Sequence, residues 1–133
     1  MTDHLDNPDE LADRHLKLQL RLAQLERVEA CQQSFLTFVR AMWPEFIAGK
    51  HHRLIAEKLE AVANGKLKRL IVNMPPRHTK SEFASFLFPA WMVGRNPAMK
   101  IIQATHTTEL AVGFGRKVKN LIEREDYEEI FPE

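Results

Sequence analysis

The chain has 133 residues, 44% of them hydrophobic and 28% charged, which is typical of a soluble globular protein and excludes a disordered one. One domain with a hydrophobic core fits in that length, whereas a motor domain followed by a nuclease domain does not. The formal net charge of +1 excludes a global excess of charge, so any DNA-contacting surface has to be a local basic patch.

The cysteine content and the hydropathy of the sequence indicate the cellular compartment in which the protein would work. The one cysteine, Cys31, excludes an internal disulfide and offers no CxxC pair for zinc. The simplest inference is a reducing, cytosolic setting in which Cys31 is a small buried or helix-face side chain. The acidic start lacks an apolar signal core, and no run approaches the ~20 apolar residues that span a bilayer. We therefore expect a soluble, intracellular protein with no membrane partner.

The chain is expected to begin disordered and then become helical. Residues 1–9 are acidic and have little to bury, which predicts disorder. Residues 10–33 have a helical composition in which leucines recur every seven residues, at Leu11, Leu18 and Leu25. Adjoining positions carry Leu22 and Val28, whereas Leu16 and Leu20 fall off the stripe. Such a helix packs on the body of the protein or on a neighbour, but three heptads are too few to predict a coiled coil.

Two further helices are predicted before any strand. Residues 34–42 carry one apolar face and must stop near Trp43, because Pro44 follows. A third helical pattern follows Gly49, and Asn64–Gly65 ends it with a glycine suited to the left-handed conformation. The sequence thus predicts a helical start to an α/β domain.

The second half of the chain alternates apolar runs with helical patterns. Residues 70–72 and 100–105 are predicted to be strands, the first of them buried on both faces of a parallel sheet. A helix should begin near Lys80, bury its phenylalanines and leucine (Phe83, Phe86 and Leu87), and be kinked or ended by Pro89. Another should run over residues 107–124, with an apolar stripe at Leu110, Phe114, Val118 and Ile122.

Strand, helix, strand and helix with short connections predict a right-handed βαβ unit whose ligand lies at the carboxyl edge of the sheet. Two strands make a poor sheet. Either residues 43–50 contribute another strand, or the chain is a fragment.

The most informative stretch is NMPPRHTKSE, residues 73–82, which lies between the first expected strand and a helix. The phosphate-loop rule GxxxxGK[ST] asks for a lysine that reaches the terminal phosphates and a hydroxyl that binds magnesium. Lys80 and Ser81 fit the rule, but Met74 and Thr79 stand where the glycines belong. Thr79 is the more serious departure, because a β-branched residue resists a positive φ.

An anion site at this loop also follows from elementary chemistry. Pro75 and Pro76 have no N–H, so the donors left for a phosphate are the five amides of Arg77, His78, Thr79, Lys80 and Ser81. These amides lie at a helix start, beside two cationic side chains. The alternative is a proline turn with solvated basic side chains before an ordinary helix.

Several separated motifs in the same order carry a family resemblance. They are Lys50–His52, Gly65–Val72, PPRHTKSE (residues 75–82), Phe88–Trp91 with Gly94–Pro97, and Tyr127–Pro132. Over residues 35–132 the chain resembles the N-terminal part of the ATPase domain of phage terminase large subunits, the motors that package viral DNA. The common form of the loop in that family is PPRHGKSE, so Thr79 is a departure within the match. The first thirty or so residues lie outside the resemblance.

The resemblance implies an α/β fold, in which N-terminal helices precede a partial P-loop NTPase (RecA/helicase-like) parallel sheet. Residues 1–33 would be a disordered start and a helix, and residues 34–133 the N-terminal portion of the ATPase domain. The implied cofactors are ATP and Mg²⁺. In the intact protein, ATP hydrolysis would drive double-stranded DNA into a procapsid, and a C-terminal nuclease would cut it. Implied partners are the DNA, the portal protein, the small terminase subunit and a homo-oligomeric ring, in the host cytoplasm and not in the virion.

The resemblance also suggests roles for single residues. Lys80 would bind the β and γ phosphates and Ser81 the magnesium ion; the alternatives are a solvated lysine and a helix-capping serine. Arg77 resembles the family's loop arginine, a γ-phosphate sensor, with an exposed arginine as the alternative. His51 and His52 occupy the segment that contacts adenine, although the usual glutamine is missing there. Adjacent helical histidines point about 100° apart, so they do not face one metal.

Other candidates lie further along the chain. Thr105 and His106 would couple the nucleotide pocket to DNA from the edge of the sheet, with helix capping by a threonine as the alternative. Contacts to the DNA backbone could come from Arg116, Lys117 and Lys119, with Arg124, Lys66, Lys68 and Arg69, or these could be a solvated face. The two tryptophans are expected to be core anchors, with stacking on a base or on adenine as the alternative: Trp43 and Trp91.

Two hydrolytic features are missing from the sequence. After Lys100 no apolar run ends in paired acids, the Walker B arrangement that completes a magnesium site, and Asp126 and Glu128–Glu129 follow a helix. No spaced set of acids suits two-metal DNA cleavage. We expect an N-terminal piece that binds nucleotide weakly and does not turn it over. The rivals are a helicase-type ATPase fragment and a non-catalytic interaction or remnant module.

Overall fold

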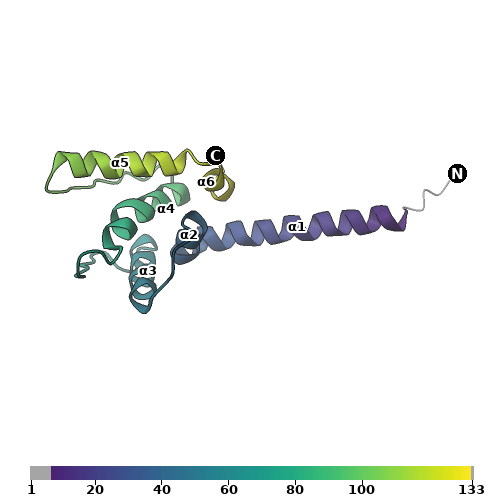
Figure 1. Ribbon diagram of the computed structural model, residues 1–133, viewed down its shortest axis with the longest axis horizontal. Coiled ribbons are helices and arrows are strands. Elements are labelled where there is room, and N and C mark those ends of the chain that lie inside the picture. Colours follow the sequence, from purple (N-terminus) through teal and green to yellow (C-terminus); the bar gives the residue numbers. More distant parts are fainter. Residues whose placement is uncertain (1–6, 133) are drawn as a thin grey trace.

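The structure, a computed structural model, describes residues 7–132, and its regular elements are all helical (Figure 1). They are α1 (Pro8–Gln33), α2 (Phe35–Met42), α3 (Lys50–Ala63), the π-helical η1 (Glu82–Leu87), α4 (Phe88–Arg95), α5 (Thr108–Ile122) and α6 (Glu125–Ile130). No strand occurs between residues 7 and 132. The prediction of an α/β fold with a parallel P-loop sheet is therefore wrong.

The two expected strands are present as apolar segments that pair with nothing in the described chain. Residues 70–72 and 100–105 lie outside any helix or strand, and so do residues 43–49, the possible third strand. Ile71 is 86% exposed and Ile102 is 96% exposed. A strand of a parallel sheet needs hydrogen-bonding neighbours beside it and helices over its faces. Apolar composition predicted the local preference, but it could not supply those neighbours.

α1 begins with a local cap and leaves the body of the protein as a long arm (Figure 1). The Asn7 side chain accepts a hydrogen bond from the Asp9 N–H at 3.3 Å, and Pro8 occupies the first turn, where its missing N–H costs nothing. The predicted disorder is thus wrong for residues 7–9, and residues 1–6 lie outside the described part. Every side chain of residues 8–27 is exposed, so this length of α1 does not pack on the body.

The body starts where α1 ends, and α3 supplies the cap of α2. The Ser34 hydroxyl accepts from the Thr37 N–H at 3.3 Å, and a Glu60 carboxylate oxygen accepts from the Phe35 N–H at 2.8 Å. Both are orphan donors at the start of α2. At the same C-terminal end of α3, Gly65 has φ +73°, which confirms the predicted left-handed cap.

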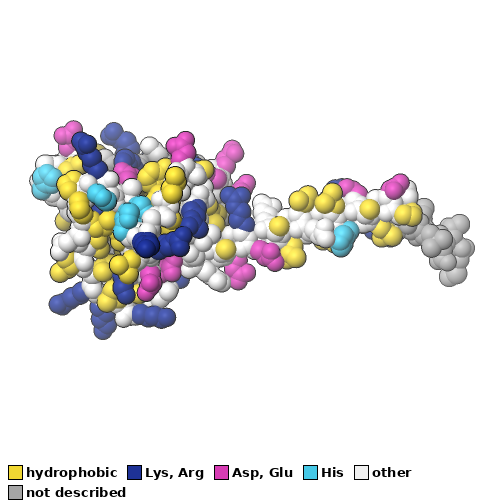
Figure 2. Space-filling model, turned by 60° about the horizontal axis from the view of Figure 1, so that its bottom comes forward, with side chains coloured by type: hydrophobic (Ala, Val, Ile, Leu, Met, Phe, Trp, Pro, Cys, Tyr) yellow, Lys and Arg dark blue, Asp and Glu magenta, His cyan; other side chains and the backbone are white. Residues whose placement is uncertain are grey.

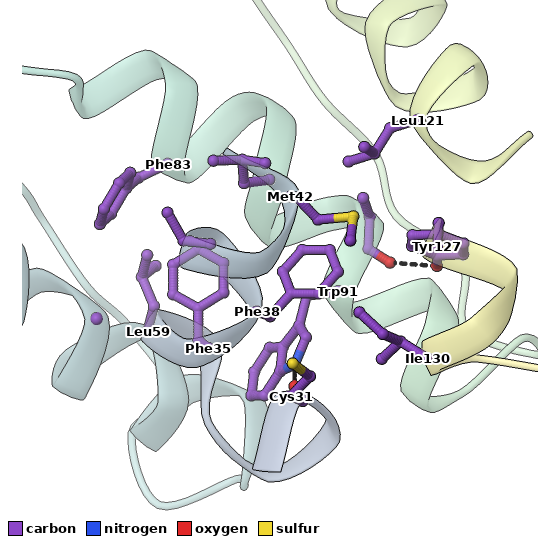
Figure 3. Packing of buried hydrophobic residues seen from close by; sticks show 14 residues of the cluster. Cys31, Phe35, Phe38, Met42, Leu59, Phe83, Trp91, Leu121, Tyr127 and Ile130 are labelled. Atoms are coloured by element: carbon purple, nitrogen blue, oxygen red, sulfur yellow. Dashed lines mark hydrogen bonds between the residues drawn. The ribbon is translucent and has the colours of Figure 1, made fainter. Parts of the chain in front are cut away.

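The core lies between α2, α3, η1, α4, α6 and the C-terminal ends of α1 and α5 (Figure 3). Its largest fully buried side chains are Trp91, Phe35, Phe38 and Phe83. The Trp91 indole donates to the Cys31 carbonyl at 2.9 Å, which fixes α4 to the base of α1 and confirms that this tryptophan is a core anchor. Burial raises the pKa of the Cys31 thiol, as expected for a buried structural cysteine.

The helix after the loop begins as the π-helix η1 and continues as the α-helix α4. In η1 the Phe88 N–H bonds to the Phe83 carbonyl five residues back, and α4 then continues to Arg95 with Pro89 in its first turn. Pro89 has no N–H to donate to the Ser85 carbonyl four residues earlier. The Gln103 side chain donates to that carbonyl instead, at 3.0 Å. Pro89 thus does not end the helix; it follows a π-helical turn, a common place for a kink.

None of the helices within residues 7–132 combines the length and the apolar character needed to cross a bilayer.

Candidate functional site

The sequence-predicted loop forms a tight curl before η1. Arg77 has φ +65° and Thr79 has φ +60°, and these are the only left-handed residues other than glycine in the described chain. Left-handed residues turn successive N–H groups toward a common side, which is how backbone nests bind anions. Two prolines with fixed φ precede the curl, Pro75 and Pro76. Thr79 therefore adopts the positive φ that its β-branch disfavours.

The curl encloses a concavity of its own. A cavity of about 430 Å³ is lined by residues 74–82 and by nothing else, a size within the range of small-molecule sites. The side chains of Arg77, His78, Lys80 and Ser81 are exposed around it. The loop is neither extended nor filled by neighbouring side chains.

A histidine on α3 holds the loop in place. The Gly49 N–H donates to Nδ1 of His52 at 2.9 Å, so Nδ1 carries no proton and Nε2 does. Nε2 then donates to the Thr79 hydroxyl at 2.7 Å, and that hydroxyl donates to the His78 carbonyl at 2.6 Å. One continuous relay thus joins the start of α3 to the residue that replaces the second glycine of the motif.

The His52 ring packs against aromatic side chains of the core. The His52 ring is 8% exposed and contacts the rings of Phe46 and Phe83 at centroid distances of 4.8 and 5.4 Å. Desolvation by burial lowers the pKa of His52, and the neighbouring His51 and His78 lower it further. The lowered pKa keeps the His52 ring neutral, and the neutral ring is the form that the hydrogen bonds to Gly49 and Thr79 require.

The structure brings three of the predicted histidines together at the loop. The ring centroids of His51 lie 3.8 Å from His52 and 5.9 Å from His78. Figure 2 shows histidine side chains on the body as well as on the arm. His52 bonds to Thr79, whereas His51, the other histidine predicted to contact adenine, is exposed. No group of three or more ligating side chains suited to a metal ion occurs in residues 7–132.

Three of the basic candidates for DNA contact are paired with acidic side chains. Lys117 lies beside the loop end, where it pairs with Glu82 at 3.1 Å, whereas Lys119 pairs with Glu123 at 3.7 Å. Arg124 pairs with Asp126 at the start of α6. The remaining cations are exposed on α5 or on the segment after α3: Arg116, Lys66, Lys68 and Arg69.

Thr105 and His106 lie just before α5 and not at the edge of a sheet. The Thr105 hydroxyl donates to the Thr107 carbonyl at 2.6 Å, and the Thr107 hydroxyl accepts from the Leu110 N–H at 3.3 Å. Thr107 is therefore the capping threonine that was the alternative for this segment. His106 is exposed. It was predicted to lie near the pocket because it would follow a strand of the sheet, and the described chain has no such strand.

Sequence reasoning missed the contact that defines this site, between His52 and Thr79. The two residues are 27 positions apart, and no periodicity or spacing rule connects a helix-start histidine to a loop threonine. The one available signal was the oddity of a threonine at a glycine position, which calls for a stabilising partner. The candidate site is thus defined by its own geometry. No protein-family model, curated protein or solved structure matches this chain.

Proposed function

We propose that residues 74–82 bind the phosphates of ATP, and that this chain is the N-terminal piece of a DNA-packaging ATPase of the terminase large-subunit type. The observation that carries the proposal is the cavity of about 430 Å³ bounded by residues 74–82, with left-handed residues at Arg77 and Thr79. Cations and helix-start amides at one concave surface favour a polyanion.

The side chains divide into distinct roles. Lys80 neutralises the terminal phosphates as a point charge, whereas Arg77 can bind the γ-phosphate oxygens with paired N–H groups. The amides from Arg77 to Ser81 supply uncharged donors. Magnesium in nucleotide sites keeps several waters and takes phosphate oxygens with few protein ligands, so the Ser81 hydroxyl fits as its one ligand from this loop.

We do not expect residues 74–82 to hydrolyse ATP. Glu82 is the only acid that lines the cavity, and its carboxylate is paired with Lys117. We therefore expect binding without turnover. In the intact protein, other segments would complete the motor, with double-stranded DNA, portal protein and small subunit as partners in the host cytoplasm.

Equilibrium binding of a fluorescent ATP analogue tests the proposal. Lys80→Ala should weaken binding about tenfold or more, the usual effect of removing a charged phosphate contact. Lys119→Ala is the matched control, because Lys119 is also exposed but pairs with Glu123. Inorganic triphosphate should compete with the analogue, and adenosine should compete poorly.

Equal affinities for the wild-type chain and the Lys80→Ala variant would contradict the proposal. That outcome would favour the non-catalytic interaction module, for which the threonine in the loop speaks. If adenosine competed and inorganic triphosphate did not, the analogue would be bound through its base and not by residues 74–82, which would contradict the proposal.

A further inference from the structure

The arm of α1 carries six leucines that the body does not cover. Leu11, Leu16, Leu18, Leu20, Leu22 and Leu25 are each between 50% and 67% exposed, and Figure 2 shows hydrophobic side chains spaced along the arm. A helix of this length takes most of its stability from packing of an apolar face. The body is excluded as the packing partner, because every side chain of residues 8–27 is exposed.

Four of the six exposed leucines follow a heptad seam. Spacings alternate between four and three residues along Leu11, His15, Leu18, Leu22 and Leu25, which we call the α1 seam. In heptad terms Leu11, Leu18 and Leu25 are d positions and His15 and Leu22 are a positions. Glu29, the next a position, bonds to Gln33 instead, so the seam ends where the helix joins the body.

The outer face of the arm, opposite the seam, carries an ion pair formed within α1. Asp13 and Lys17 form an ion pair at 2.6 Å, and they occupy f and c positions opposite the seam. Leu16 and Leu20 occupy b and f positions, off the seam. Four of the six exposed leucines thus lie along one edge of the arm, as the seam of a two-stranded coiled coil requires, and the other two lie on the outer face.

Charge on the flanks of the seam selects the partner and its direction. Arg21 is a g position and Glu26 is the following e position. In a parallel pair each g residue faces the next e residue of the other helix, so Arg21 meets the partner's Glu26 twice by symmetry. In an antiparallel pair g faces g, and Arg21 would meet the partner's Arg14.

We propose that α1 pairs in parallel with α1 of a second copy of this chain through the α1 seam. His15, a polar residue at an a position, sets the register at some cost in stability. The phosphate loop belongs to the body, so this inference stands or falls independently of nucleotide binding.

Sedimentation equilibrium of the full chain over a range of concentrations tests the pairing. The wild-type chain should form dimers. Leu18→Lys should raise the dimer dissociation constant about a hundredfold or more, because two buried leucines are lost from each dimer. Leu20→Lys is the matched control: Leu20 is 63% exposed and Leu18 67%, but only Leu18 lies on the seam. Equal effects of the two variants, or a wild-type monomer at every concentration, would overturn the proposal.

Direction is tested by charge exchange and crosslinking. Arg21→Glu should weaken the dimer, and Arg21→Glu with Glu26→Arg should restore it. Leu11→Cys should form a disulfide-linked dimer on mild oxidation, because equal d positions meet only in the parallel pair. Native Cys31 is 1% exposed and does not compete. Crosslinking only between a Leu11→Cys chain and a Leu22→Cys chain would instead show an antiparallel pair, in which a positions meet d positions, and refute the parallel one.

Discussion

The imidazole of His52 donates to the hydroxyl of Thr79 at 2.7 Å, and this bond fastens the candidate phosphate loop to α3. It also explains how a β-branched residue keeps a φ of +60° in the loop. Backbone strain of that kind costs of order 1–3 kcal/mol and persists only where the surroundings fix it. The relay from Gly49 through His52 to the His78 carbonyl supplies those surroundings.

Removal of the Thr79 hydroxyl should loosen this loop. Thr79→Val keeps the shape of the side chain but leaves Nε2–H of His52 without an acceptor, at a cost of about 1–2 kcal/mol in unfolding free energy. Thr79→Ser is the control, because it keeps the hydroxyl. Urea unfolding should rank the stabilities as wild type and Ser variant above the Val variant. A Val variant as stable as the Ser variant would mean that the hydrogen bond does not hold the loop.

The stability of the protein should fall on acidification through His52. Its pKa is lowered from 6.5 in the folded state, so the unfolded chain binds its proton at the higher pH. The contribution is complete above pH 6.5 and is lost as the pH falls through the lowered folded pKa. Protonation of Nδ1 also breaks its bond from Gly49.

Unfolding free energies measured across the acidic range should therefore decline below pH 6.5 in the wild-type chain. His52→Asn offers the control, since its amide oxygen can still accept from Gly49 but does not titrate. The difference between the two chains should shrink as the pH falls. A constant difference would show that another group causes the acid sensitivity.

Gly94 is required by close packing between α4 and α6. A methyl group built there lies 2.5 Å from Cδ2 of Phe131 and 2.6 Å from the Tyr127 hydroxyl, which donates to the Ala90 carbonyl at 2.7 Å (Figure 3). Gly94→Ala should lower the unfolding free energy by about 1–3 kcal/mol, because the core must shift. Thermal or urea unfolding measures the change.

Gly113→Ala is the matched control for that substitution. Gly113 also lies within a helix, but a methyl group there meets nothing within 4 Å. Alanine should therefore stabilise α5 by up to about 1 kcal/mol through helix propensity. Substitutions that shifted stability in the same direction at both positions would argue against the packing explanation.

The cap that α3 provides to α2 should be measurable. Glu60→Ala removes the acceptor for the Phe35 N–H and should lower the unfolding free energy by about 1 kcal/mol. Glu57→Ala provides the comparison, because Glu57 is on the same helix and its side chain is 72% exposed beside Lys58. We expect the second variant to unfold within a few tenths of a kcal/mol of the wild type. Comparable losses in both would assign the effect to α3 itself.

Local features of this protein could be predicted because local physics specifies them. The end of α1, the positions of α2 and α3, the left-handed Gly65 and the start of α5 follow from apolar period and capping residues. Those rules involve residues a few positions apart. The short α6 escaped prediction, because its six residues carry too little periodicity.

The sequence by itself therefore determined where α1, α2, α3 and α5 lie, the left-handed cap at Gly65 and a basic loop before a helix, since each depends on neighbouring residues. Only the tertiary structure decided that residues 70–72 and 100–105 stay unpaired, that the α1 leucines stay exposed, and that His52 meets Thr79. Strand pairing, burial and side-chain contacts depend on what distant segments bring to the same place. A local preference states what a segment can form, and the rest of the chain decides whether it does.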